Sequence, residues 1–337
     1  MPFVRDILNY RSLSIVGLDK NTGKTVCLNY ILRRLNSLGI PVGVTSIGVD
    51  GEQVDSVFAT AKPEITLYEG MRFITSEQHY LKRQLLSVLE HVDSRRTALG
   101  PLVTARVLLR GKALLSGAAT TGVLRDQIQL LDSMGSRLTI VDGALSRLSL
   151  ASPTVTEAMV LATGAAVSAS VKQLVARTLF QYRLICLDEV DRNLRPRLST
   201  IESGLWGIDD DGQPHDLGIA SVFLIGRSDT DLLRYGTTLF AAGAVSDRLL
   251  RTLAAKAKGI TLIARDFTKL FISPEAYNDF LRRDGRLMVL QRTRLIAVTL
   301  NPTSPQGFVL DSAATCHALA DALQTPVYDV MKINPPQ

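Results

Sequence analysis

The sequence predicts an α/β protein built mainly on a parallel sheet, followed by a second α/β region. Residues 12–47 read as a strand, a loop, a helix and a second strand, and a helix between two apolar strands is the crossover that parallel strands need. Apolar strand-like and helix-like segments then alternate to about residue 323. At roughly 150 residues per domain, the 337 residues suggest two domains. We place the domain boundary between 1–200 and 201–337, and a second region that continues the sheet of the first is the alternative.

Composition narrows the class of protein. With 46% hydrophobic and 21% charged residues and a mean hydropathy of +0.16, the chain is too apolar for a disordered protein and too often interrupted by charge for a membrane bundle. No signal-like or membrane-spanning stretch is evident, so we expect a cytoplasmic protein without a membrane partner. The net charge of +6 favours anionic ligands without identifying them. Cys27, Cys186 and Cys316 are far apart, which argues against disulfides and a thiolate metal site.

The first strand–helix–strand unit has clear boundaries. An apolar strand over 12–16 ends at Gly17, and apolar residues recur at helical spacing from Gly23 onward. Gly39 is placed to end that helix, and β-branched residues at 42–47 predict the second strand.

Later elements follow from the same patterns. Hairpins are expected from the pairs 65–68 with 71–75 and 103–109 with 113–116, and a boundary or excursion is expected near 200–218. The predicted helices are 120–134, 171–179, 246–258, 274–283 and 312–323, and the predicted strands are 137–142, 158–163, 260–264, 287–290 and 295–300.

The loop between the first strand and helix has the features of a phosphate-binding loop. Five residues separate its first glycine from Gly-Lys-Thr, whereas the Walker A pattern has four. Gly23 would let main-chain amides approach phosphate, Lys24 would neutralise its charge, and the Thr25 hydroxyl would reach Mg²⁺. An accidental Gly-Lys-Thr in an ordinary turn is the alternative, and Lys20 is either a second phosphate lysine or a solvated charge. The expected nucleotide-binding residues are Gly17, Lys20, Asn21, Thr22, Gly23, Lys24 and Thr25.

Two carboxylates are candidates for holding the metal. Asp142 follows the apolar run 138–141, in the manner of a Walker B aspartate, and Asp50 follows the second predicted strand. We expect Asp50 and Asp142 to act with Thr25 as metal ligands and with Lys24 in hydrolysis. A turn-forming Asp-Gly is the alternative for both aspartates. Glu52 is a further candidate for positioning a water molecule.

The loop resembles that of dethiobiotin synthetase and its relatives in the SIMIBI class of P-loop NTPases. Over most of the chain, the sequence more closely resembles the P-loop subunit of the reactivase for adenosylcobalamin-dependent lysine 5,6-aminomutase. The segments that carry this resemblance are 14–30, 45–52, 116–121, 140–165, 242–250, 270–277 and 295–307.

The resemblance implies a helper ATPase that opens the aminomutase so that intact cobalamin replaces the damaged cofactor. It implies ATP and Mg²⁺ as ligands, and the aminomutase and other reactivase subunits as partners. Asp50 and Asp142 would sense the γ-phosphate, and the loop 143–156, including Arg147, would relay its state. GTP in place of ATP, and the oligomeric state, stay open.

Other functions have less support in the sequence. The main alternative is a free-standing ATP-dependent ligase of the dethiobiotin synthetase type, with Lys20 facing a small carboxylate or amine. A metallochaperone lacks a His-rich or Cys-rich tract, and an amidotransferase would have to use Cys186, on an expected strand, or the adjacent pair Cys316 and His317. The arginines at 282–283 and 292–294 lack interleaved aromatic residues, so we expect no nucleic-acid partner.

Overall fold

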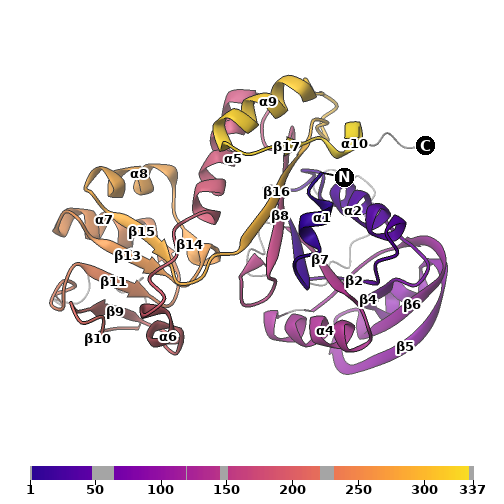
Figure 1. Cartoon of the computed structure of the whole chain (residues 1–337), viewed down its shortest axis with the longest axis horizontal. Helices are drawn as coiled ribbons and strands as arrows, with labels where there is room; N and C mark the ends of the chain where they lie inside the picture. Colours follow the sequence, from indigo (N-terminus) through magenta and orange to yellow (C-terminus); the bar gives the residue numbers. More distant parts are fainter. Residues whose placement is uncertain (1, 48–63, 119, 145–150, 221–230, 334–337) are drawn as a thin grey trace. The chain divides into compact units, whose positions relative to one another are not determined.

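The structure is a computed structural model that describes residues 2–47, 64–118, 120–144, 151–220 and 231–333 (Figure 1). It divides the chain into two compact units. Unit 1 comprises Met1–Leu179 and Arg294–Gln337, and unit 2 comprises Phe180–Thr293. None of the helices in the described residues is long and apolar enough to cross a membrane.

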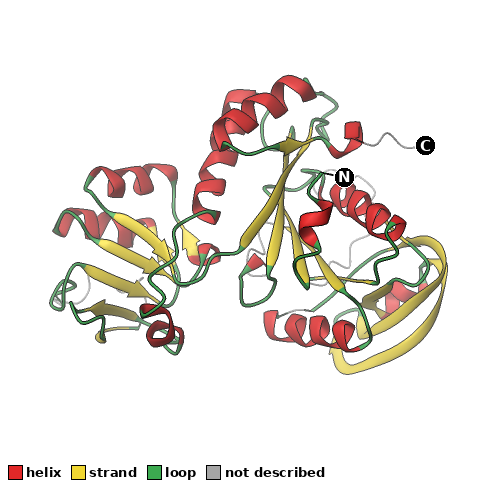
Figure 2. Cartoon of the chain, viewed as in Figure 1, coloured by secondary structure: helices red, strands yellow, loops and turns green. Residues whose placement is uncertain are grey.

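Unit 1 is built on one large, mostly parallel sheet with the order β17-β16-β8-β1-β7-β2-β4-β6-β3, and β5 pairs with β6 (Figure 2). Its strands are β1 (Ser12–Gly17), β2 (Val42–Ser46), β3 (Ile65–Leu67), β4 (Arg72–Ser76), β5 (Gln84–Thr97), β6 (Gly100–Ala113), β7 (Leu138–Ala144), β8 (Ala158–Gly164), β16 (Arg294–Asn301) and β17 (Val327–Tyr328). The strands from β17 to β4 run parallel, and β6 is antiparallel to β3, β4 and β5. The predicted α/β class with a mainly parallel sheet is therefore confirmed.

Helices cover both faces of this sheet. They are α1 (Val4–Ile7), α2 (Lys24–Ser37), α3 (Glu77–Leu81), α4 (Thr121–Ser133), α5 (Val171–Ile185), α9 (Ser312–Leu323) and α10 (Val330–Ile333). The apolar face of α2 packs with α1 and α10 in the main core. Leu174 of α5 and Leu319 of α9 pack with Leu300, and Leu131 of α4 packs with Ile74. Ile74 and Leu300 alternate along their strands with Phe73 and Ala297 of the main core, so α4, α5 and α9 cover the opposite face.

Unit 2 has its own sheet, ordered β10-β9-β11-β13-β15. Its elements are α6 (Leu194–Ser199), β9 (Leu205–Ile208), β10 (Pro214–Ile219), β11 (Thr238–Ala241), β12 (Val245–Ser246), α7 (Asp247–Lys256), β13 (Thr261–Ala264), the 3₁₀ helix η3 (Phe267–Lys269), β14 (Leu270–Phe271), α8 (Pro274–Arg282) and β15 (Arg286–Val289). Phe240, Ile263 and Leu198 contribute to its core, which shows that this unit buries an apolar centre of its own.

The two predicted hairpins are wrong. The segments β3 and β4 do not pair with each other, because both pair with β6. The second predicted hairpin is one continuous strand, β6, which crosses the expected turn at Gly111. The hairpin that does form joins β5 to β6, and its first strand was not predicted.

The chain also divides differently from the expected boundary near residue 200. Residues 205–219 form the antiparallel pair β9 and β10 within unit 2 and not a linker. Residues from Arg294 onward return to unit 1, because β16 pairs with β8 in parallel and β17 then pairs with β16. The C-terminal segment therefore extends the first sheet, and unit 2 is an insertion that begins within α5, at Phe180, and ends directly before β16.

Candidate functional site

The candidate site lies at the carboxyl ends of the central strands of unit 1. After β1 the chain crosses to β2, and after β7 it moves to β8 on the other side of β1, so the strand order reverses beside β1. Gly17 at the end of β1 is in register with Ala144 of β7 and Ala162 of β8. Such a reversal in an open α/β sheet leaves a crevice outside the strand ends, where ligands bind.

The loop that leaves β1 is held by short local hydrogen bonds. Leu18 N donates to Ala162 O at 2.8 Å, which anchors the loop to β8. The Thr22 hydroxyl donates to Asp19 O at 2.9 Å, and the Asp19 carboxylate accepts from Lys20 N at 2.7 Å. Lys24 Nζ, at the start of α2, lies 3.4 Å from Asp19 O. The lysine side chain therefore folds back over the loop that precedes it.

Glycine is required at two positions of this loop. Gly23, immediately before α2, has φ +89°, and a Cβ there would lie 2.7 Å from Asn301 Cβ. A Cβ on Gly17 would lie 2.8 Å from Lys24 Cγ. The aliphatic part of Lys24 therefore packs directly over the end of β1. The residue at position 23 must be small and must adopt a left-handed backbone conformation.

Asn301 lies at the site although it is not among the nucleotide-binding residues expected from the loop motif. It ends β16, in register with Gly164 of β8, and its Nδ2 donates to Asn21 O at 3.2 Å. Its main-chain oxygen also accepts from Ala165 N at 2.9 Å. A polar residue directly after the predicted strand 295–300 was the available signal, but the pairing of β16 with β8 cannot be read from chain order.

The loop combines two lysines with the carboxylates of Asp19 and Asp142. Burial lowers the pKa of Lys24, the carboxylates of Asp142 and Asp19 oppose this effect, and the nearby charge of Lys20 lowers the pKa further. The first turn of α2 contains no acidic residue, and its N-cap Gly23 provides no side-chain hydrogen bond. Two lysines and the amide groups of a helix start thus converge on one loop, and a bound phosphate would relieve the repulsion between the lysines.

Asp142 lies beside this loop, as the sequence predicts for a metal-binding carboxylate. It is half-buried on β7 opposite Ile15 of β1, and its charge acts on Lys24. Its main-chain oxygen accepts from Ile47 N at 3.3 Å and from the Ser46 hydroxyl at 3.2 Å. The carboxyl ends of β1, β7 and β2 are therefore joined around Asp142.

The structure brings together most of the predicted site. The expected nucleotide-binding residues follow one another from the end of β1 through the loop to the first turn of α2: Gly17, Lys20, Asn21, Thr22, Gly23, Lys24 and Thr25. Thr25 is half-buried in that turn. The remaining candidates, Asp50, Glu52 and Arg147, lie outside the described residues, so their place relative to the loop stays a prediction.

A buried cluster of polar side chains lies further along the same edge of the sheet. Ser116 Oγ is 3.0 Å from His79 Nδ1 and 2.8 Å from Ser76 Oγ, and it accepts from Ser76 N at 2.9 Å. Ala118 forms a parallel bridge to Ile47. The cluster therefore fixes residues 116–118 against the end of β2, and the packing leaves no space for a side chain at position 117, where a Cβ would overlap Ser46 O.

The cysteines do not form a nucleophilic site. Cys186 lies in the turn after α5 and not on the predicted strand, and burial raises its pKa. Burial also raises the pKa of Cys316 on α9, and it raises that of Cys27 on α2 to about 12. All three cysteines therefore favour the thiol, which is the unreactive form.

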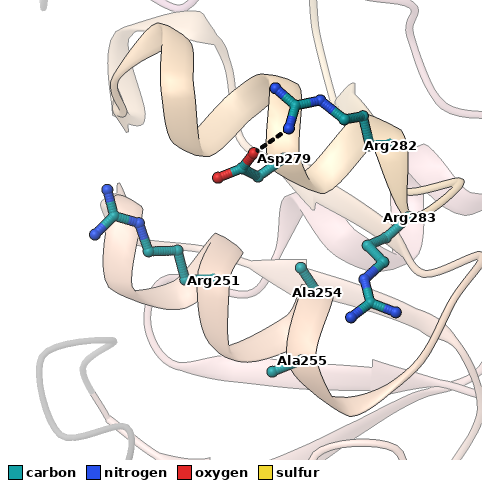
Figure 3. Close-up of a pocket in the computed structure, with 6 residues that line it drawn as sticks. All are labelled: Arg251, Ala254, Ala255, Asp279, Arg282 and Arg283. Carbon is teal, nitrogen blue, oxygen red and sulfur yellow. Dashed lines mark ion pairs between the residues drawn. The ribbon is translucent and has the colours of Figure 1, made fainter.

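Two other features of the described residues lie away from the loop. No group of three or more His, Cys, Asp or Glu side chains in the described ranges could hold a metal ion. A pocket of about 430 Å³ lies between α7 and α8 in unit 2, lined by Arg251, Ala254, Ala255, Asp279, Arg282 and Arg283 (Figure 3). Arg282 is paired with Asp279 at 2.9 Å. None of the predicted site residues lines this pocket.

Comparisons with known proteins found no counterpart of this chain: no family model, no curated protein and no solved structure matches it.

Proposed function

We propose that unit 1 binds a magnesium–nucleoside triphosphate and acts as a nucleotide-controlled switch. One observation carries this proposal. Lys24, at the start of α2, lies over the end of β1, where the strand order reverses, and it interacts electrostatically with Asp142. Each element alone occurs in many proteins. Their convergence on one edge is the arrangement that phosphate binding requires.

The residues present fit a triphosphate and its metal. The amide groups at the start of α2 would hold phosphate oxygens, and the Lys24 ammonium would neutralise the negative charge. Thr25 and Asp142 would hold Mg²⁺, which usually takes one or two protein oxygens besides the phosphates. The metal supplies charge neutralisation at the transferred phosphoryl group. ATP is the expected nucleotide, and GTP is the alternative.

The partner in this proposal is an adenosylcobalamin-dependent aminomutase. This step rests on the sequence resemblance to the reactivase subunit. Three of the segments of this chain that carry the resemblance, 14–30, 140–165 and 295–307, contain the loop, Asp142 and Asn301. ATP binding and hydrolysis would switch the conformation of the segments at this edge of the sheet. This switch would open the mutase so that its damaged cofactor is exchanged. The protein would thus be an ATPase that serves another enzyme.

A reactivation assay tests the proposal. Lysine 5,6-aminomutase is first inactivated by turnover and then incubated with this protein, ATP, Mg²⁺ and fresh adenosylcobalamin, with and without the other reactivase subunit. We expect activity to return only when ATP and the parent protein are present, and not with Lys24→Ala. Reactivation that is equally fast without this protein would contradict the partner assignment. Product formation from a small carboxylate or amine without any mutase would instead support the ligase alternative.

A further inference from the structure

The hairpin of β5 and β6 leaves one long strand at the edge of unit 1. β5 spans 14 residues and among the described strands it pairs with β6 alone. The opposite edge of the sheet is β17, which has two residues (Figure 1). A short edge strand is protected against pairing with another chain, whereas a long one is exposed to it.

The hairpin also exposes large apolar side chains. Six of them are between 38% and 64% exposed: Leu86, Val88, Leu89, Val92, Leu108 and Leu109. Leu86 and Leu109 are register partners on the two strands, so their side chains form an adjacent pair. Half of the twelve exposed large hydrophobic residues in the described part of the chain therefore belong to this one hairpin. Such a concentration is typical of an interaction surface.

The acidic residues of the hairpin are already paired within the chain. Glu90 accepts from Arg72 Nε at 2.8 Å and from Arg106 Nε at 2.7 Å. Arg95 is paired with Asp93 at 2.8 Å and with Asp126 of α4 at 2.7 Å. The sequence of β5 holds two acidic and two basic residues, and neither lysine nor proline, the two residues that commonly block edge pairing. β5 therefore carries no net charge, and we expect apolar contact to select its partner.

We propose that this hairpin is the contact between two copies of the chain, related by a two-fold axis across β5. The occupant must be apolar, without net charge and extended, and β5 of a second copy has all three properties: four exposed apolar side chains, two acidic residues against two basic ones, and a length of 14 residues. A two-fold axis places β5 antiparallel to itself and brings the exposed leucines of both copies together. At about 3.3 Å per residue, β5 is about 45 Å long, which is long enough for an interface approaching the usual 800 Å² or so per partner.

Side-chain packing carries most of this contact. The pairing of β5 with β6 shifts register at four places, between Gln84/Leu86, Leu86/Ser87, Leu89/His91 and Val92/Arg96. These irregularities bend the edge and interrupt any continuous ladder. The inference goes beyond the proposed nucleotide function, because no residue of the phosphate loop takes part in it.

Sedimentation velocity of the full chain between about 1 and 50 µM tests this inference, because a dimer of micromolar affinity is distinguished across this range from one at least tenfold weaker. We expect a parent mass of twice 36.7 kDa. Leu86→Glu and Leu109→Glu, made separately in case one fails to fold, should weaken the dimer at least tenfold, because each buries a charge against apolar side chains. The matched control is Phe271→Glu on β14 of unit 2, where the parent side chain is 64% exposed, and it should stay dimeric.

A monomeric parent would overturn the inference, as would a dimer that both hairpin variants leave intact or that Phe271→Glu disrupts equally. Circular dichroism and nucleotide binding of the variants separate this result from the proposed function. A monomeric Leu86→Glu that binds nucleotide like the parent supports the interface independently of any nucleotide result.

Discussion

Asn301 Nδ2 donates a hydrogen bond of 3.2 Å to Asn21 O, which joins two residues 280 positions apart in the sequence. Asn21 has φ +58°, in the left-handed region. Asn301 ends a strand that joins the sheet only after the chain has completed unit 2. The loop between β1 and α2 is thus held both by Lys24, from its own flanking helix, and by Asn301, from the far end of the chain.

Removing the Asn301 amide should weaken nucleotide binding without unfolding the protein. Asn301→Ala leaves Asn21 O without this donor, and the loss of one hydrogen bond amounts to about 1 kcal/mol, or about a fivefold lower affinity. Isothermal titration with Mg-ATP measures the change. An affinity equal to that of the parent would show that the bond does not position the loop.

Gly23→Ala should abolish tight nucleotide binding. The substitution places a Cβ 2.7 Å from Asn301 Cβ at a residue with φ +89°, so both the loop and β16 must shift. Gly39→Ala is the matched control, because Gly39 also has a positive φ, +65°, but a Cβ there would meet no atom within 4 Å. We expect the control to lose about 1 kcal/mol of stability and to bind nucleotide like the parent. Equal nucleotide affinities for the two variants would show that the close approach of Gly23 to Asn301 is not needed for binding.

Asp142→Asn should retain nucleotide but lose Mg²⁺-dependent hydrolysis. The amide keeps the size of the side chain and removes the charge that faces Lys24. Phosphate release with and without Mg²⁺ is the measurement, and we expect a drop of at least about 100-fold, similar to the loss of one charge-stabilising group in other active sites. Hydrolysis at the parent rate would remove Asp142 from the mechanism.

Nucleotide affinity should fall at alkaline pH. Burial lowers the pKa of Lys24 in the free protein, whereas bound phosphates favour the ammonium and raise it. Binding is therefore coupled to proton uptake, full affinity is present below the free-state pKa, and affinity is lost as pH rises through the bound-state pKa. Titration calorimetry in buffers of different ionisation enthalpy measures the uptake. Lys24→Arg, which stays charged, should show none. A parent with no proton uptake would contradict this description of Lys24.

Glu90→Gln should destabilise unit 1 by about 1 kcal/mol at neutral pH. Burial raises the pKa of Glu90, but the hydrogen bonds from Arg106 and Arg72 outweigh this effect and hold the pKa below its ordinary value of 4.5. Because the folded-state pKa is the lower one, the stabilisation is present above about 4.5 and is lost as pH falls through the folded-state pKa. Urea unfolding at pH 7 and below pH 4.5 measures it.

The Glu90 prediction has a matched control on the surface. Asp132 pairs with Arg11 at 2.9 Å, but its side chain is 48% exposed, whereas that of Glu90 is 19% exposed. Asp132→Asn should therefore change stability by less than about 0.5 kcal/mol. Similar losses of unfolding free energy in both variants would show that the position of Glu90 between two arginines adds no stability.

The sequence predicts those elements in which apolar period and end signals agree. The predicted strands 12–16, 137–142 and 158–163 appear as β1, β7 and β8, with ends that differ by one or two residues, and the helix predicted after Gly23 appears as α2. Thr120, at the start of the predicted helix 120–134, caps α4 by accepting a hydrogen bond from Val123 N at 3.4 Å. Local signals of this kind also located the loop between β1 and α2, because a strand, a glycine and a helix start are all visible along a short stretch.

The missed features depend on pairing between distant segments. β5 was not predicted because its four register shifts break the alternation of apolar and polar residues. The Gly- and Asp-rich stretch at 207–212 suggested a boundary, whereas its Asp209 organises the turn between β9 and β10 by accepting from Asp211 N and Gln213 N. The return of β16 to the first sheet leaves no trace in local composition, and Asn301 was missed for that reason.

Titration of the parent protein with Mg-ATP, beside Lys24→Ala, tests the central claim most directly. Lys24 is the ammonium that the loop, Gly17 and Asp142 surround. We expect the parent to bind one equivalent of nucleotide and the variant to bind at least about 30-fold more weakly, since a hydrogen bond from a charged group contributes about 2 kcal/mol. The fold of the variant, followed by circular dichroism, should be unchanged. Equal affinities, or no binding of ATP or GTP by the parent, would contradict the account.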